Sequence, residues 1–259
     1  MQVNSGLAIE AGNLSYGYGG VSALKDVGFV LREGEYLAVI GPNGGGKTTL
    51  IKLLLGILEP TSGFVRIHGR PASDRRARLD VGYVPQRVSS EAAEFPATVR
   101  EIVESGRTPR RRAFSRRSAA DREAVDHALE TLEIADLSDR TIGSLSGGQR
   151  QRAFIARAVA GEPRILILDE PTVGVDHSAQ EAFRQFLTHA NREHGMTIVF
   201  VTHDVEFVSR EATSVLCLNH SLVCHGRPGE YLKEDFLVRL YGREVKLVEH
   251  EHHDGHGHV

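Results

Sequence analysis

A glycine-rich segment that ends in a lysine and two threonines carries the clearest chemistry in this sequence. Its glycines let backbone N–H groups approach phosphate oxygens without a Cβ atom in the way, and a following helix would add its positive N-terminal end. Lys47 can reach the β- and γ-phosphates, and the Thr48 hydroxyl is a candidate Mg²⁺ ligand. The segment therefore predicts binding of a nucleoside triphosphate by Gly41, Pro42, Asn43, Gly44, Gly45, Gly46, Lys47, Thr48 and Thr49.

Two adjacent acids follow a short apolar run at residues 165–168. If that run is a strand beside the phosphate loop, the carboxylate of Asp169 can hold Mg²⁺ through water. Glu170 is one residue further on, so its side chain points elsewhere and can orient and deprotonate an attacking water molecule. The pair indicates hydrolysis of the bound nucleotide.

A third motif lies at residues 145–149, where a segment rich in alanine and arginine begins. Ser146 is a natural N-cap for a helix, and the next two glycines leave backbone donors accessible. This motif, Leu145, Ser146, Gly147, Gly148 and Gln149, predicts a helix N-terminus that binds an anion.

The elements that must position these residues can be read from the apolar pattern. Residues 36–40 form a short apolar run typical of a strand buried on both faces, and the pattern returns at 165–168 and 197–201. A helix is expected from Thr48 to about residue 58, before Glu59 and Pro60 stop it. Strands at 7–9 and 29–31 predict an antiparallel edge layer, and further strands are expected at 64–67 and 81–84.

Between these strands the pattern becomes helical. Thr98 and Glu101 form a capping-box pair, another helix is expected at about 119–134, and a third after Ser146. We therefore predict an α/β fold with four parts: a nucleotide-binding core with an antiparallel β layer at 1–86, a helical subdomain at 87–160, the core continued at 161–242, and a flexible histidine-rich tail at 243–259.

Composition narrows the class of protein. The 259 residues are 41% hydrophobic and 25% charged with a net charge of −3, which is ordinary globular composition and gives no general attraction to nucleic acid. No apolar run approaches the roughly 18 residues of a membrane span, and no signal peptide is visible. Cys217 and Cys224 are expected to be small buried residues on strands, forming neither a bridge nor a metal pair. All of this fits a reducing cytoplasm, so a membrane role would come through a partner.

In this order, the three motifs resemble those of the ATPase subunits of ABC (ATP-binding cassette) transporters, and the resemblance covers nearly the whole chain. It implies a RecA-like P-loop core with an antiparallel β subdomain and an inserted helical subdomain. It also implies ATP and Mg²⁺ as ligands and ATP hydrolysis coupled to transmembrane transport. Gly45 departs from the small non-glycine residue common at its position, so we expect a slightly more flexible loop with no loss of binding.

The resemblance assigns further residues to the site. Gln86 matches the glutamine that senses Mg²⁺ and the γ-phosphate, and His203 matches the switch histidine that contacts the γ-phosphate. Tyr18 stands at the place of the aromatic that stacks on adenine, with Tyr16 as its competitor. Asp176 matches the loop that crosses the dimer interface.

The resemblance also implies partners. In the family, the helix N-terminus at Ser146 reaches the γ-phosphate held by the opposite subunit, so a head-to-tail homodimer with two ATP molecules is expected. Integral membrane permease subunits and an extracytoplasmic metal-binding protein complete such a system. The chain would then lie peripherally on the cytoplasmic face of the membrane and bind no nucleic acid.

The transported substrate is indicated less directly. Residues 215–226 resemble the same region in bacterial zinc importer ATPases, and residues 96–99 with 106–107 fit the metal-importer branch. The tail contributes histidine ligands suited to Zn²⁺, namely His250, His252, His253, His256 and His258. The Glu, Asp and Gly residues between these histidines argue against a purification-tag remnant. We expect a zinc importer, with manganese, iron or iron-chelate import as the alternative.

Two other classes fit worse. A soluble ABC ATPase of DNA repair or translation would carry coiled-coil arms, zinc insertions or two cassettes, none of which the sequence contains. A small-molecule or nucleotide kinase would leave residues 145–149 and His203 unexplained.

A basic cluster precedes the second predicted helix. Its first reading is a solvated face, and anionic lipid headgroups or an acidic partner loop are alternatives. Nucleic acid is poorly supported because no aromatic residues interleave usefully. The cluster consists of Arg107, Arg110, Arg111, Arg112, Arg116 and Arg117.

Overall fold

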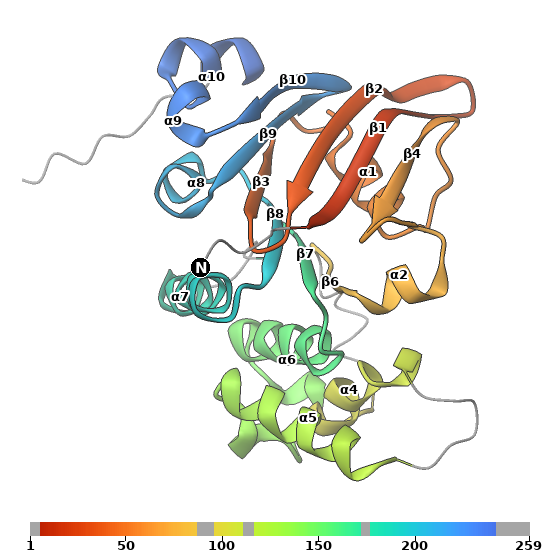
Figure 1. Cartoon of the computed structure of the whole chain (residues 1–259). Coiled ribbons are helices and arrows are strands. Elements are labelled where there is room, and N and C mark those ends of the chain that lie inside the picture. Colours follow the sequence, from red (N-terminus) through yellow and green to blue (C-terminus); the bar gives the residue numbers. More distant parts are fainter. Residues whose placement is uncertain (1–5, 87–95, 111–116, 172–176, 242–259) are drawn as a thin grey trace, which may run out of the picture.

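The computed structural model describes residues 6–86, 96–110, 117–171 and 177–241 (Figure 1). It contains two sheets and a layer of helices, which is the α/β architecture expected from the sequence. The boundaries proposed between the core, the helical subdomain and the tail stay a prediction.

The larger sheet carries the nucleotide motifs. Its order is β10-β9-β3-β8-β7-β6, and β3 (Tyr36–Ile40), β7 (Ile165–Asp169), β8 (Thr197–Val201) and β6 (Val81–Val84) are parallel. Every residue of β3, β7 and β8 is buried, as the continuous apolar runs predict. At the other edge, β9 (Ser214–Asn219) pairs in parallel with β3 and antiparallel with β10 (Ser221–Gly226).

The smaller sheet is antiparallel and confirms the predicted edge layer. Its order is β2-β1-β4-β5, built from β1 (Leu7–Tyr18), β2 (Val21–Arg32), β4 (Ser62–Ile67) and β5 (Arg70–Pro71). Apolar residues of this sheet and of α1 (Lys47–Leu54) share one core cluster with the larger sheet. The prediction that this helix runs to residue 58 is wrong. Gly56 has φ of +63°, and a Cβ there would lie 2.3 Å from the Ala72 carbonyl oxygen, so the chain turns sharply after Leu54.

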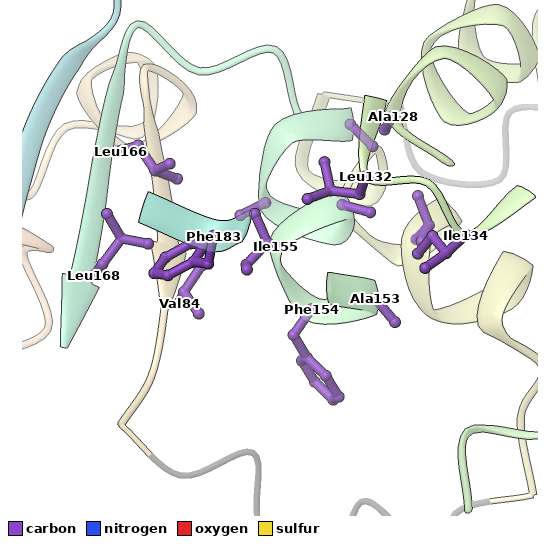
Figure 2. Packing of buried hydrophobic residues seen from close by; sticks show 14 of the residues in the cluster. Val84, Ala128, Leu132, Ile134, Ala153, Phe154, Ile155, Leu166, Leu168 and Phe183 are labelled. Atoms are coloured by element: carbon purple, nitrogen blue, oxygen red, sulfur yellow. The ribbon is translucent and has the colours of Figure 1, made fainter. Parts of the chain in front are cut away.

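Three helices form a separate layer, as expected: α4 (Val99–Ser105), α5 (Ala119–Thr131) and α6 (Gly147–Ala160). Each begins with a capping box, at Thr98, Ser118 and Ser146 respectively. Figure 2 shows part of the core that this layer shares with the larger sheet, in which Ile155 of α6 and Leu166 and Leu168 of β7 belong to one cluster of buried residues. Short 3₁₀ turns at Thr108–Arg110, Ala135–Leu137 and Ile142–Ser144 connect this layer, and α2 (Arg75–Leu79) precedes β6.

The C-terminal third adds helices that the sequence reading did not predict. These are α7 (His177–His194), α8 (Val205–Glu211), α9 (Pro228–Tyr231) and α10 (Glu234–Tyr241). Leu237 and Leu240 of α10 are buried in one cluster with Ala38 and Ile40 of β3. The last described helix therefore lies against the strand that leads into the phosphate loop.

Two expectations are corrected by the packing. Cys217 and Cys224 are buried on strands, as predicted, but they form a disulfide, because the register of the β9–β10 hairpin sets them opposite each other. Arg107 does not lie on a solvated face. It is 8% exposed, its Nε donates to Asp121 Oδ1 at 3.0 Å and its Nη1 to the Ala160 carbonyl at 3.1 Å, and it pairs with Glu162.

The other two described arginines of that cluster, Arg110 and Arg117, also bind groups of the protein. Arg110 donates to the carbonyl oxygens of Gly161, Leu79 and Glu162, and Arg117 pairs with Glu104. Arg111, Arg112 and Arg116 lie outside the described residues. Arg107 and Arg110 thus attach the helical layer to the chain around the start of β7.

Candidate nucleotide site

The phosphate loop leaves the end of β3 and enters α1, which is the strand–turn–helix context the motif requires. Gly41 has φ of +152°, and a Cβ there would lie 1.9 Å from the Leu218 carbonyl oxygen, so only glycine fits. The Gly45 N–H donates to the Pro42 carbonyl at 3.0 Å, and the Gly45 carbonyl accepts from the His220 N–H at 2.8 Å. These two bonds oppose the extra flexibility predicted at Gly45.

Lys47 lies buried beneath the loop. Its Nζ donates to the carbonyl oxygens of Gly41 and Pro42 at 2.9 and 3.1 Å and lies 3.9 Å from Glu170 Oε1. Burial lowers the pKa of the Lys47 ammonium, and the nearby carboxylates of Glu170 and Asp169 raise it in part. Thr48 is exposed on the loop side of α1, and Thr49 is buried.

The Glu170 carboxylate is the point where the predicted catalytic residues meet. Gln86 Nε2 donates to Glu170 Oε2 at 2.7 Å, and His203 Nε2 lies 2.7 Å from Glu170 Oε1. Lys47 Nζ is further away, at 3.9 Å from the same Oε1 atom. Glu170 has φ of +43°, a conformation that costs about 1–2 kcal/mol for a non-glycine residue. The backbone turns there, which separates the direction of this side chain from that of Asp169.

Asp169 ends β7 and is 3% exposed. Burial and then the neighbouring Glu170 raise its pKa to about 6, although Lys47 and Lys52 act in the opposite direction. A buried carboxylate whose charged form is disfavoured is one that a divalent cation would stabilise. The oxygen donors of Asp169, Thr48 and Gln86 are the hard ligands that Mg²⁺ prefers, so the residues present fit this ion.

The family of this chain follows from its similarity to known proteins. Residues 24–173 match the family model described as ABC transporter, which is more than half of the chain. The chain belongs to the ABC transporter family. It is therefore an ABC-type ATPase.

Curated relatives of this ABC ATPase cover most of its length. It is 41% identical to the zinc uptake system ATP-binding protein ZurA of Listeria innocua, over 86% of this chain and 87% of that protein. It is also 41% identical to the high-affinity zinc uptake system ATP-binding protein ZnuC of Bacillus subtilis, over 80% and 88%.

Solved structures show the same fold. CbiO1 of Clostridium perfringens, part of the ABC transporter complex CbiONQ, is 31% identical with a TM-score of 0.77 over 90% of this chain and 94% of its own. The ADP conformation of MJ1267, an ATP-binding cassette of an ABC transporter, matches at a TM-score of 0.79 over 90% and 98%. At 23% identity, the latter speaks for the fold alone.

The two candidate adenine-stacking residues differ in exposure. Tyr16 is partly buried against the core cluster of the two sheets, whereas Tyr18 is 46% exposed at the end of β1. Their rings make an edge contact with centroids 4.9 Å apart. The greater exposure of Tyr18 favours it over Tyr16 as the residue that stacks on adenine.

In the motif at residues 145–149 of this ABC ATPase, the side chains of Ser146 and Gln149 make their hydrogen bonds within their own helix. The Ser146 hydroxyl accepts from the Gln149 N–H at 3.3 Å, and Gln149 Oε1 accepts from the Ser146 N–H at 3.1 Å. Leu145 is buried, and Ser146 and Gly147 are exposed, but Gly148 is buried against the prediction that both glycines are accessible. Among the described residues, no hydrogen bond or ion pair joins this motif to the phosphate loop.

Some predicted residues cannot be placed. Asp176 and the five tail histidines lie outside the described residues. Within the described part of the chain, no group of three or more His, Cys, Asp or Glu residues is placed to hold a metal ion by itself. No helix in the same part of the chain is long and apolar enough to cross a membrane.

One residue of the site was missed by sequence reasoning. The hydroxyl of Tyr241, the last residue of α10, accepts a hydrogen bond from the Gly41 N–H at 3.1 Å. A signal was present, since Phe236, Leu237, Leu240 and Tyr241 are spaced as on one face of a helix. That pattern predicts a packed helix but says nothing about which strand it packs on.

Proposed function

We propose that this chain is the ATP-hydrolysing subunit of a zinc importer. The observation that carries the proposal is its similarity, over most of both chains, to ATP-binding proteins named for zinc uptake. Manganese, iron or iron-chelate import remains the alternative cargo, since the pathway for the metal would lie in other chains.

The proposed roles follow from the contacts around Glu170. Backbone donors of residues 41–48 and Lys47 hold the phosphates, and the exposed Tyr18 stacks on adenine. Thr48, Asp169 and Gln86 would hold Mg²⁺, which supplies positive charge against the phosphate oxygens. Glu170 orients the attacking water and accepts its proton, and His203 contacts the γ-phosphate. Gln86 and His203 both bond Glu170 here, so nucleotide binding exchanges these contacts for phosphate oxygens.

The proposed assembly is a homodimer that forms when ATP binds. The backbone donors at Gly147 and Gly148 open α6 and would serve the ATP held by the second copy. Asp176 belongs to the loop assigned to the same interface. Membrane permease subunits would place the dimer peripherally on the cytoplasmic face, and an extracytoplasmic metal-binding protein would deliver the metal.

The proposal is tested by metal uptake in the natural host with its own copy deleted. Wild-type chain should restore growth in zinc-depleted medium and uptake of radioactive Zn²⁺, while Glu170→Gln should restore neither. Labelled Mn²⁺ and iron are the controls and should enter equally in both strains. Restoration of manganese or iron uptake instead would move the assignment to that metal. If no metal's uptake depends on the chain, the importer proposal is wrong.

We propose separately that the histidine-rich tail binds Zn²⁺ with modest affinity. Neutral imidazoles bind the ion and protonated ones do not, so binding should weaken as pH falls through about 6.5. Deleting residues 250–259 should remove most of the zinc bound in calorimetry at pH 7.5 and leave basal ATPase activity unchanged. Equal zinc stoichiometry in the full-length and truncated proteins would show that the tail is not a metal site.

A further inference from the structure

Tyr241 lies 200 residues along the chain from the phosphate loop and touches it directly. The residue is half-buried at the end of α10, which is anchored by Leu237 and Leu240 in the cluster behind β3. Its position is therefore set by packing against the same strand that ends at Ile40. A helix anchored in this way can hold a side chain at a fixed place beside the loop.

The bond to Gly41 involves the residue at which the loop begins. The Gly41 N–H donates to the Tyr241 hydroxyl at 3.1 Å, and the Gly41 carbonyl accepts from Lys47 Nζ at 2.9 Å. The Leu218 carbonyl blocks the side on which a Cβ would lie. Gly41 is thus held on three sides, and Tyr241 supplies the acceptor for its buried N–H group, for which the described residues offer no other.

The ring of Tyr241 has a second neighbour in the site. Its centroid is 6.5 Å from that of His203, and the two rings are inclined at 55°. His203 in turn lies 2.7 Å from Glu170 Oε1. Burial raises the pKa of the Tyr241 phenol, as does the charge of Glu170, while the bond from Gly41 lowers it. The phenol is therefore neutral at physiological pH and able to accept this bond.

We propose that Tyr241 is a positioning residue of the ATPase site, whose hydroxyl holds Gly41 in the phosphate loop and whose ring holds His203. The two functions are separable. Loss of the hydroxyl affects the ordering of the loop and so the binding of nucleotide. Loss of the ring affects the placement of His203 and so turnover. The inference rests on ATP hydrolysis at this site and not on the identity of the transported metal.

The test compares three purified full-length variants with wild type in steady-state Mg-ATP hydrolysis. Tyr241→Phe removes only the hydroxyl and should raise KM for ATP about three- to tenfold, with kcat within about twofold of wild type. Tyr241→Leu keeps an apolar side chain in the cluster but removes the ring, so kcat should also fall, by about tenfold. Tyr231→Phe is the matched control, because Tyr231 packs in the same cluster and, among the described residues, has no hydrogen bond or ring contact to the loop.

The control separates positioning from simple anchoring of the helix. Thermal melts should give the Tyr241→Phe and Tyr231→Phe proteins similar Tm values, while only the first has a raised KM. Equal KM values for the two phenylalanine variants would overturn the role of the hydroxyl. An unchanged kcat in Tyr241→Leu would overturn the role of the ring. A wild-type protein that binds but does not hydrolyse ATP would count against the ATPase site itself.

Discussion

Two buried aspartates show how differently the nucleotide site and the helical layer treat charge. Asp121, in the helical layer, accepts from Ser118 and from Arg107, and these bonds lower its pKa to about 2. Asp169, in the site, has its pKa raised to about 6 by burial and by Glu170. Hydrogen bonds from the chain stabilise the charged form of Asp121, whereas the surroundings of Asp169 disfavour its charged form.

The same contrast holds for the residues around the two aspartates: those in the helical layer are paired, and those in the site are in less favourable states. The helices of the layer all begin with complete capping boxes, and Arg107 is paired on both sides. In the site, Glu170 has a positive φ and the Lys47 pKa is lowered by burial. The site therefore gives up stability for groups that a charged ligand would complete, and the helical layer does not.

The largest expected effect comes from removing the charge at the centre of the site. Glu170→Gln should lower kcat for ATP by about 10²–10⁴-fold, because the base for the attacking water is lost while the phosphate contacts remain. Steady-state hydrolysis and nucleotide titration measure the two properties. Glu206→Gln, an exposed residue paired with Arg210, is the control and should turn over normally. Near-normal turnover of Glu170→Gln would remove that residue from its role.

The next largest effect concerns residues 145–149 at the start of α6, which are expected to contact ATP held by a second copy of the chain. In a Glu170→Gln background, Ser146→Arg and Lys47→Ala chains should each fail to dimerise with ATP. Their mixture should form heterodimers with one intact composite site, and hence about half the bound ATP per dimer. Sedimentation with and without ATP measures this.

Ser118→Arg is the matched control for that experiment, because it breaks the same kind of capping box on α5 outside the motif. Dimer formation by this variant should be normal. If the mixture associates no more than either chain alone, the head-to-tail dimer is wrong.

A smaller effect tests the two aspartates directly. The Asp169 pKa of about 6 is above the unfolded value of about 3.9, so the native protein binds more protons and its stability falls as pH rises between them. Asp169→Asn should therefore stabilise the nucleotide-free protein by about 1–3 kcal/mol at pH 7.5, and by about half as much at pH 5.

Asp121→Asn should do the opposite. The lowered pKa of Asp121 means that its stabilising contribution is present above about pH 4 and is lost only as pH falls toward 2. This variant should destabilise the protein at both pH 7.5 and pH 5. Denaturant unfolding without nucleotide or Mg²⁺ measures both variants. A gain at Asp169 that does not change with pH would contradict the assigned pKa.

The sequence alone is sufficient to predict elements whose signals lie within a few neighbouring residues. The buried strands β3, β7 and β8 can be predicted from their apolar runs, and the start of α4 from the Thr98–Glu101 pair, because each signal lies within a few residues. The end of α1 was missed because it depends on how closely Gly56 approaches Ala72.

The remaining misses depend on distant pairs. Arg107 reads as one charge in a basic run, but its partners are 14 and 55 residues away. The Cys217–Cys224 bridge depends on hairpin register, and the bond from Gly41 to Tyr241 on the packing of a terminal helix. No period or spacing in the sequence reports such contacts. The roles given to Gln86, His203 and Tyr18 came from family resemblance. The structure brings the first two together at Glu170.

The tip of the β9–β10 hairpin has a consequence for how the molecule can move. At His220, whose φ is +57°, the carbonyl accepts from the Lys25 N–H at 2.7 Å and the N–H donates to the Gly45 carbonyl at 2.8 Å. One residue thus fastens β2 of the antiparallel sheet to the phosphate loop. We expect β2 and the phosphate loop to move together as a single rigid body because both are bonded to the backbone of this one residue.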